Sequence, residues 1–224
     1  MVQKYHFAIP LYRQEKEWRQ LGLPLSRTML ANWIIHASHL YLEPLRERMH
    51  TLLLEEPCLH ADETPVQVMN EKGRKNTSKS YMWLYSSGEQ EAGHAIRLFE
   101  YSATRKGENA VKFLNGYTGY LHTDDYAGYN QVPGVKRCLC WAHVRRKFVD
   151  AKPAGMDKES DTLVKEGLLR IRQLFEIERE LKGLPSKERK QKRLEKEKPL
   201  LEAFWKWAEA SIQSVMPRSK ISHA

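Results

Sequence analysis

The chain has 224 residues, 41% of them hydrophobic and 29% charged, which supports one substantial domain with a buried core and excludes a wholly disordered protein. Lysine and arginine outnumber aspartate and glutamate by 37 to 28, and the net charge of +9 favours an anionic partner, nucleic acid first and an anionic membrane surface second. The sequence has no apolar run long enough to span a membrane, no apolar secretory core at its start and only three cysteines, so we expect a protein of the reducing cytoplasm.

Residues 1–55 are predicted to form an N-terminal helical segment. A first helix is expected from about Tyr12 to Leu21, followed by a turn that contains Gly22. Ser26 stands at the N-cap position of a second helix, whose apolar side would carry Leu30, Trp33 and Ile34. Two helices joined by a short glycine-containing turn outline a possible helix-turn-helix. The alternative is an ordinary helical hairpin that packs on the next domain.

Residues 56–155 change from helical to strand patterns. Strands are expected at Pro57–Met69, Tyr81–Tyr85, Ala95–Phe99, Tyr120–Thr123 and Arg137–Trp141, and helices at Thr104–Leu114 and His143–Ala151. A polar turn at Glu71–Asn76 separates the first two strands. Three strands, a helix and further strands are typical of an RNase H-like core, so we predict an α/β fold with a mixed sheet.

Residues 156–224 return to helical spacing and are predicted to form an antiparallel helical pair. A first helix would carry apolar residues from Leu163 to Leu181, and Ser186 would cap the second. Pro199 fits best at a helix start, because a proline inside a helix costs about 3 kcal/mol. We interpret the dense charges of 187–198 as a solvated face, with a surface that follows the DNA backbone as the alternative.

Two short stretches each place a carboxylate at or just past a predicted strand end. Asp62 lies in His60–Val66, and Asp124 lies in Leu121–Tyr129. Two adjacent strands of one sheet would bring these acids together, although they are far apart in the sequence. Acids are uncommon in strands unless they are paired or bind a metal, and divalent cations prefer carboxylate oxygens. The alternative is that both side chains cap backbone amides of turns.

The same stretches resemble, in order, the motifs of a known family, the insertion-sequence sixty-six transposases. The matching segments are Pro10–Glu15, Leu30–Trp33, His60–Pro65, Thr123–Tyr129 and Cys140–Phe148. The resemblance runs through almost the whole chain. It implies a DDE-type transposase with an RNase H-like fold. Such an enzyme uses two Mg2+ or Mn2+ ions to cut DNA and to join DNA strands during transposition of a bacterial mobile element.

Asp62 then corresponds to the first catalytic, metal-binding acid and Asp124 to the second. Asp125 stands where the family usually has glycine, so either neighbour could be the second ligand, and we favour Asp124. Glu63 should face away from Asp62, because successive side chains of a strand alternate.

Cys140 and His143 form a C-x2-H pair after the second acid. With Cys138 they could hold structural zinc, but the sequence offers no fourth ligand at a sensible spacing. We expect instead that Cys140, His143 and Arg146 lie near the acids, where they would support the site or contact DNA phosphate. The alternative is that Cys140 belongs to a core and Arg146 is simply exposed.

The resemblance implies that residues 156–224 belong to a C-terminal helical insertion and that the third acid of the DDE site follows it. No such acid is found before Ala224, so we expect a shortened chain, a truncated gene or a degraded element that is catalytically incomplete on its own. Glu159 falls at an integrase-like distance after Asp124, but we predict that it lies in a loop. Two other functions remain open: a DNA-binding or assembly module without catalysis, and a metal-dependent nuclease. Expected partners are the DNA of the element ends and target, bound in the bacterial nucleoid, and a second copy of the chain on that DNA.

Overall fold

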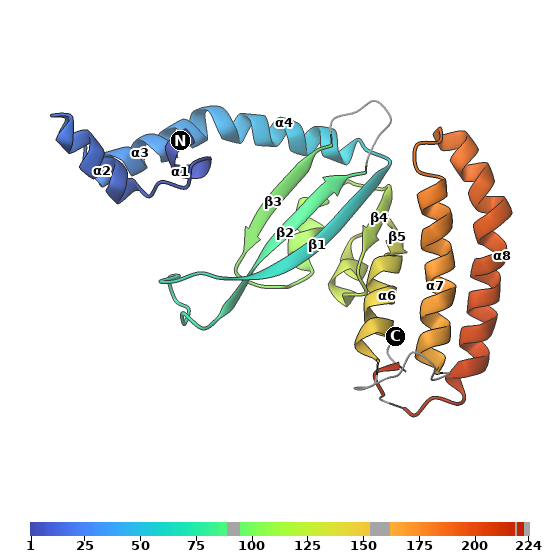
Figure 1. Ribbon diagram of the computed structural model, residues 1–224. Coiled ribbons are helices and arrows are strands. Elements are labelled where there is room, and N and C mark those ends of the chain that lie inside the picture. The colour runs from blue at the N-terminus through green and yellow to red at the C-terminus, as the bar shows by residue number, and fades with distance from the viewer. Residues whose placement is uncertain (89–94, 153–161, 218, 222–224) are drawn as a thin grey trace.

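The computed structural model describes residues 1–88, 95–152, 162–217 and 219–221. A helical arm, a sheet unit and a C-terminal helical pair follow one another along the chain (Figure 1). Within those ranges no helix combines the length and the apolar character that a membrane crossing requires.

The arm contains four α-helices and one π-helical turn. Their bounds are α1 Val2–Tyr5, α2 Leu11–Gln20, α3 Arg27–Ala37 and α4 Glu43–Leu54, with the π-helical turn at Ser38–Leu42 between α3 and α4. The predicted cap of α3 is confirmed, since the Ser26 hydroxyl accepts a hydrogen bond from Met29 N at 3.2 Å. Gly22 has a φ of +80° in the turn before it. The prediction for Trp33 was wrong: this side chain is exposed, because α3 projects away from the sheet.

Helix α4 joins the arm to the sheet unit. Leu53 is fully buried in the sheet core, and His50 Nε2 lies 2.8 Å from the carbonyl oxygen of Phe113. Arg46 forms an ion pair with Glu100. The rest of the arm extends past the sheet (Figure 1).

The sheet has five strands, in the order β3-β2-β1-β4-β5. Their bounds are β1 Cys58–Gln67, β2 Lys79–Ser87, β3 Arg97–Ser102, β4 Tyr120–Thr123 and β5 Lys136–Leu139. Strand β2 is antiparallel to both β1 and β3, whereas β4 is parallel to β1 and to β5. The predicted mixed α/β architecture is confirmed.

One face of the sheet is buried under α5 (Glu108–Phe113) and the 3-10 turn Ala127–Gln131. The rings of Tyr85 and Phe113 stack there with their centroids 3.8 Å apart. Helix α5 starts later than the predicted Thr104, because residues before Gly107 form a tight turn held by the side chain of Asn109. A Cβ on Gly107 would overlap the backbone of the 3-10 turn, so this close approach requires glycine.

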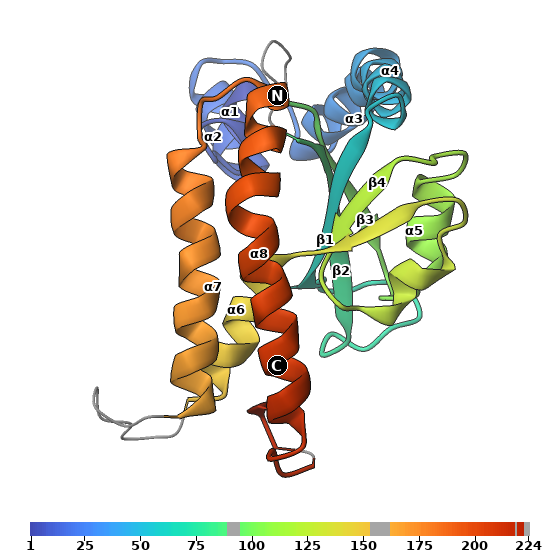
Figure 2. The ribbon, with the colours of Figure 1, turned by 90° about the vertical axis from the view of Figure 1, so that its right-hand side faces the viewer.

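The C-terminal part consists of α6 (Trp141–Asp150), α7 (Leu163–Glu180) and α8 (Ser186–Ile212). Helices α7 and α8 run antiparallel side by side, as predicted (Figures 1 and 2). Their core contains Phe148 of α6 together with Ile171 and Phe204. Trp141, predicted as the end of a strand, is the first residue of α6, where its ring packs against Phe204.

Two predictions about α8 were wrong. Ser186 is its first helical residue, and Pro185 occupies the N-cap position. Pro199 lies inside the helix rather than at its start. Contacts on both sides of the proline hold the helix together: Lys196 Nζ lies 3.0 Å from Glu180 Oε2 of α7, and Phe204 is buried in the core. Part of the charged run therefore contacts α7 rather than solvent alone.

Candidate active site

The two predicted acids lie at the same end of two neighbouring parallel strands. His60 of β1 pairs with His122 of β4, and each acid follows its histidine by two residues. Asp62 is therefore within β1, and Asp124 comes directly after β4. Continuing the observed register by two residues would set the backbone of Asp62 beside that of Asp124. The sheet topology thus brings together two residues that are far apart in the sequence.

The histidines before the acids form a stacked pair. Their ring centroids are 4.9 Å apart with an interplanar angle of 23°. Burial lowers the pKa of both imidazoles, and for His122 the neighbouring His60 lowers it further. Both rings are consequently neutral near pH 7. The His-x-Asp spacing occurs in both motifs, and this repeated spacing is the signal in the sequence from which the pair could have been predicted.

A cleft of about 150 Å3 lies beside Asp62 on this face of the sheet. Its lining includes polar side chains from β1, β2, β4 and the start of α6: His60, Asp62, Ser86, His122, Cys140 and His143. His143 Nδ1 is buried without a hydrogen-bond partner among the described residues. A buried nitrogen of this kind costs free energy unless water or a ligand satisfies it.

Glu63 points to the other face of β1, as the strand alternation predicted. Its side chain is only 1% exposed. Both carboxylate oxygens are bound: Arg105 Nε donates to Oε1 at 2.6 Å, and the Tyr129 hydroxyl donates to Oε2 at 2.6 Å. Burial, followed by this hydrogen bond to Glu63, raises the pKa of Tyr129. A buried carboxylate is therefore fully paired directly behind the first acid.

Arg105 connects this buried cluster to the second acid. Its NH2 group lies 2.5 Å from Glu63 Oε1 and 3.8 Å from Asp124 Oδ2. The guanidinium also lies over the ring of Tyr126, 4.1 Å from the centroid. The carboxyl group of Asp124 thus faces Arg105, whereas the carboxyl group of Asp62 lies on the open face, where Oδ1 accepts a hydrogen bond from Glu63 N.

The backbone after β4 is fixed by several contacts. Asp124 Oδ1 accepts a hydrogen bond from Tyr126 N at 3.0 Å, and Arg137 NH2 donates to the Asp124 carbonyl oxygen at 2.6 Å. A Cβ on Gly128 would overlap the Tyr126 ring, so glycine is needed at this close approach. These contacts hold the second acid in a defined position.

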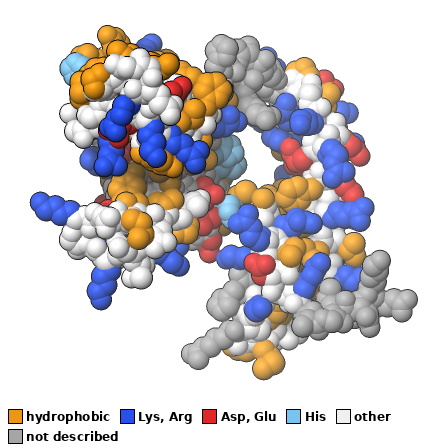
Figure 3. All heavy atoms as spheres, turned by 60° about the vertical axis from the view of Figure 1, so that its left-hand side comes forward, with side chains coloured by type: hydrophobic (Ala, Val, Ile, Leu, Met, Phe, Trp, Pro, Cys, Tyr) orange, Lys and Arg blue, Asp and Glu red, His pale blue; other side chains and the backbone are white. Residues whose placement is uncertain are grey.

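Asp125 lies in a different environment from Asp124. Its side chain is 68% exposed and lies 3.5 Å from Lys147 Nζ of α6, whereas the side chain of Asp124 is 24% exposed. Both aspartates border a groove of about 260 Å3 between the sheet edge and the C-terminal helices, where Cys140, His143, Phe204 and Trp205 also contribute. Figure 3 shows acidic side chains and histidines gathered where the sheet unit faces those helices.

The supporting residues predicted from the sequence are only partly gathered at the acids. Cys140 and His143 line both hollows, but Arg146 is exposed on α6 and lines neither. Among the residues that the structure describes, no three His, Cys, Asp or Glu side chains are arranged to hold a metal ion. Glu159 lies outside the described residues.

Sequence reasoning missed Arg105 and the structural role of Glu63. The alternation of β1 already implied a buried Glu63, and a buried carboxylate requires a cationic or hydrogen-bonding partner. Nothing in the sequence identifies that partner as Arg105, which is 42 residues away.

Comparison with known proteins gives a family match over the whole chain. The family described as "Transposase IS66 family" matches residues 1–224. Two relatives come from Sinorhizobium fredii (strain NBRC 101917 / NGR234). The uncharacterized protein y4qI is 25% identical to this chain over 236 residues, and the uncharacterized protein y4hP is 28% identical to it over 225 residues. These alignments cover 100% and 92% of this chain but 43% and 40% of the relatives, so the chain spans less than half of their length. No solved structure matches the chain.

Proposed function

Because the chain belongs to the IS66 family of transposases, we propose that it forms part of a DDE-type DNA transposase in which Asp62 and Asp124 bind the catalytic metal. The observation that carries this proposal is the parallel pairing of β1 with β4, which sets both acids at one end of the sheet. The strand order β3-β2-β1-β4-β5, with β2 antiparallel to its neighbours, supports an RNase H-like core.

The donor set fits a hard divalent cation such as Mg2+ or Mn2+. Carboxylate oxygens are the ligands that these ions prefer, and two adjacent acids repel each other unless a cation lies between them. Such ions, when bound, activate an attacking oxygen and stabilise the leaving oxygen of a phosphodiester. The imidazoles of His60, His122 and His143 lie in the cleft beside Asp62, where they can donate hydrogen bonds to phosphate or water.

Arg105 is proposed to hold Asp124 in place while no cation is bound. Its guanidinium is anchored by Glu63 and lies 3.8 Å from Asp124 Oδ2, so it offsets the charge of that carboxylate. To hold a cation together with Asp62, the Asp124 carboxyl group would have to turn from Arg105 toward the open face. Asp125 is paired with Lys147 and is mostly exposed, which favours Asp124 as the second ligand.

Two acids make an incomplete site. The resemblance implies a third acid after a helical insertion, and the described residues hold no group of three His, Cys, Asp or Glu side chains arranged for a metal ion. We therefore propose that this chain alone binds the metal weakly and does not cleave or join DNA. We propose likewise that two copies of the chain assemble on paired DNA ends and that α2 and α3 read the DNA sequence.

A DNA-binding or assembly module without catalysis is the second candidate. The contact between Arg105 and Asp124 favours it, since a structural ion pair needs no metal. Calorimetric titration of Mn2+ distinguishes the two functions. We expect Asp62→Asn and Asp124→Asn each to weaken Mn2+ binding at least about tenfold, because each removes an anionic ligand.

Asp125→Asn is the matched control for this titration, because it removes the same charge from the adjacent residue. Its Mn2+ affinity should stay within about twofold of the unaltered chain. Equal losses in all three variants would indicate only a general effect of negative charge, and the absence of any Mn2+ signal would favour the module without catalysis.

A further inference from the structure

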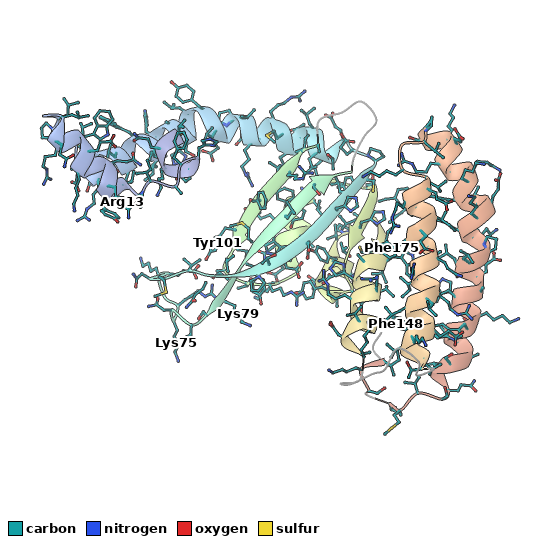
Figure 4. The ribbon with its side chains drawn as sticks, viewed as in Figure 1. Arg13, Lys75, Lys79, Tyr101, Phe148 and Phe175 are labelled. Carbon is teal, nitrogen blue, oxygen red and sulfur yellow. The ribbon has the colours of Figure 1, made fainter. Side chains whose placement is uncertain are left out.

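The hairpin formed by β1 and β2 extends beyond the rest of the sheet. Strand β4 pairs with β1 only as far as His60, and β3 pairs with β2 only from Tyr81 onward, whereas β1 and β2 stay paired out to Gln67 and Lys79. Residues 68–78 connect the two strands and are called the hairpin tip below. Figures 1 and 4 show this hairpin projecting away from the sheet, with Lys75 at its far end.

The hairpin tip has a defined conformation. Asn76 ties its two sides together, since its carbonyl oxygen accepts from Gln67 Nε2 and its Oδ1 accepts from Asn70 N, both at 2.8 Å. Asn70 and Gly73 adopt positive φ values of 58° and 75°, which set the bends of the tip.

The acidic side chain of the tip is bound internally. Arg74 NH1 lies 2.8 Å from Glu71 Oε2 and 2.6 Å from the Ser80 hydroxyl, and Tyr101 of β3 also donates to Glu71. The charges of Glu71 and Arg74 thus offset each other within the loop. The solvent-exposed surface of the hairpin therefore carries a net positive charge.

Three lysines supply this positive charge: Lys72, Lys75 and Lys79. All three are exposed, and none forms an ion pair within the described part of the chain. Some lysines of α8 are paired instead: Lys196 with Glu180 and Lys198 with Glu202. A loop with a fixed backbone and several unpaired ammonium groups is suited to phosphate, because little backbone ordering remains to be lost on binding.

We propose that the β1–β2 hairpin binds the phosphate backbone of duplex DNA through Lys72, Lys75 and Lys79, and so aligns the duplex with the acids. This inference rests on the proposed function for DNA as the partner. Strand β1 continues directly from Asp62 to the hairpin, and the five steps from Asp62 to Gln67 span roughly 17 Å at about 3.3 Å per residue. The lysines would therefore contact phosphates about five or more base pairs from the phosphate at the acids, at roughly 3.4 Å per base pair.

The test measures DNA affinity as a function of salt, in EDTA so that no metal contributes. A labelled duplex of about 30 base pairs is titrated with the chain and with its Lys72→Gln, Lys75→Gln, Lys79→Gln triple variant by fluorescence anisotropy. Each phosphate contact contributes about 0.9 to the slope of log K against log salt, so the slope should fall by about 2 to 3. The affinity near 0.1 M salt should fall about tenfold or more.

The control removes the same charge from exposed lysines of α8, in the triple variant Lys187→Gln, Lys190→Gln, Lys206→Gln. Its slope should change by less than about 1. Equal slopes for both triple variants, or an unchanged slope in the hairpin variant, would overturn the proposal and leave the hairpin lysines as a solvated surface. Failure of the unaltered chain to bind duplex DNA would overturn it as well.

A second variant tests the rigidity of the tip. Asn76→Ala removes the side-chain acceptor that binds Asn70 N but keeps all three lysines. It should weaken DNA binding several-fold while the salt slope stays the same, because the number of phosphate contacts is unchanged. An Asn76→Ala affinity equal to that of the unaltered chain would show that preorganisation of the tip is not part of the contact. Mn2+ titration is independent of these measurements, so failure of the metal site and failure of the hairpin contact can be told apart.

Discussion

The sheet unit and the C-terminal helical pair place their charged groups differently. The sheet core buries Leu53, Trp83 and Leu121 completely, and the paired carboxylate of Glu63 lies next to it. The helical pair has a smaller core, around Phe148 (Figure 4), and its ion pairs lie mainly at the surface. In the sheet unit charge is thus part of the packing that positions the acids, whereas in the helical pair it mostly covers the outside of two helices.

The largest expected effect comes from breaking the buried pair. Arg105→Ala should lower the free energy of unfolding by about 3 kcal/mol, because the Glu63 carboxylate would remain buried with only the Tyr129 hydroxyl. This corresponds to a fall in Tm of about 6–12 °C. Hydrogen exchange should show the loss of protection in β1 and β4 but not in α7.

Arg145→Ala is the control for this change, since Arg145 is an exposed arginine of α6. It should change Tm by about 1–2 °C at most. If Arg105→Ala were as harmless as Arg145→Ala, the buried pair would have no structural role, and the contrast between the two regions would be wrong.

A smaller effect is expected in the helical pair, from Glu197. Burial and the hydrogen bond with Glu178 raise the pKa of Glu197 to about 7, from an ordinary value of 4.5. The folded chain therefore holds a proton that the unfolded chain releases, and the free energy of unfolding should fall as pH rises from about 4.5 to 7.

Glu197→Gln removes this ionisation while it keeps a side chain of the same shape. The variant should be more stable than the unaltered chain at pH 8, by about 1 kcal/mol, and the difference should vanish near pH 4.5. Thermal denaturation at several pH values measures it. Glu202, which forms an exposed pair with Lys198, provides the control: the stability of Glu202→Gln relative to the unaltered chain should hardly change with pH. A difference of equal size in both variants would refute the role of Glu197.

Local patterns in the sequence predicted the sheet well. The short strand Tyr120–Thr123 has the predicted bounds, and the alternation of β1 separates Asp62 from Glu63 as expected. These features depend on neighbouring residues only. Pro199 was mispredicted because the contacts of α8 with α7 and α6 override the local preference for a break.

The two acids of the candidate site could be predicted from the sequence, but the residues around them could not. Asp62 and Asp124 stand in recognisable motifs, and the repeated His-x-Asp spacing could have indicated the stacked imidazoles. Arg105 follows a strand end in an ordinary polar turn, where an arginine usually faces solvent. Only the folding of the loop onto β1 reveals that it links Glu63 to Asp124.

The central claim is that Asp62 and Asp124 share one divalent cation. Crystals grown with Mn2+ and measured at a wavelength where manganese scatters anomalously would test it most directly. The account predicts an anomalous peak bound by a carboxylate oxygen of each aspartate, with Asp124 turned away from Arg105. A well-ordered site with no peak, or carboxyl groups that stay on opposite faces of the sheet in the presence of Mn2+, would contradict it.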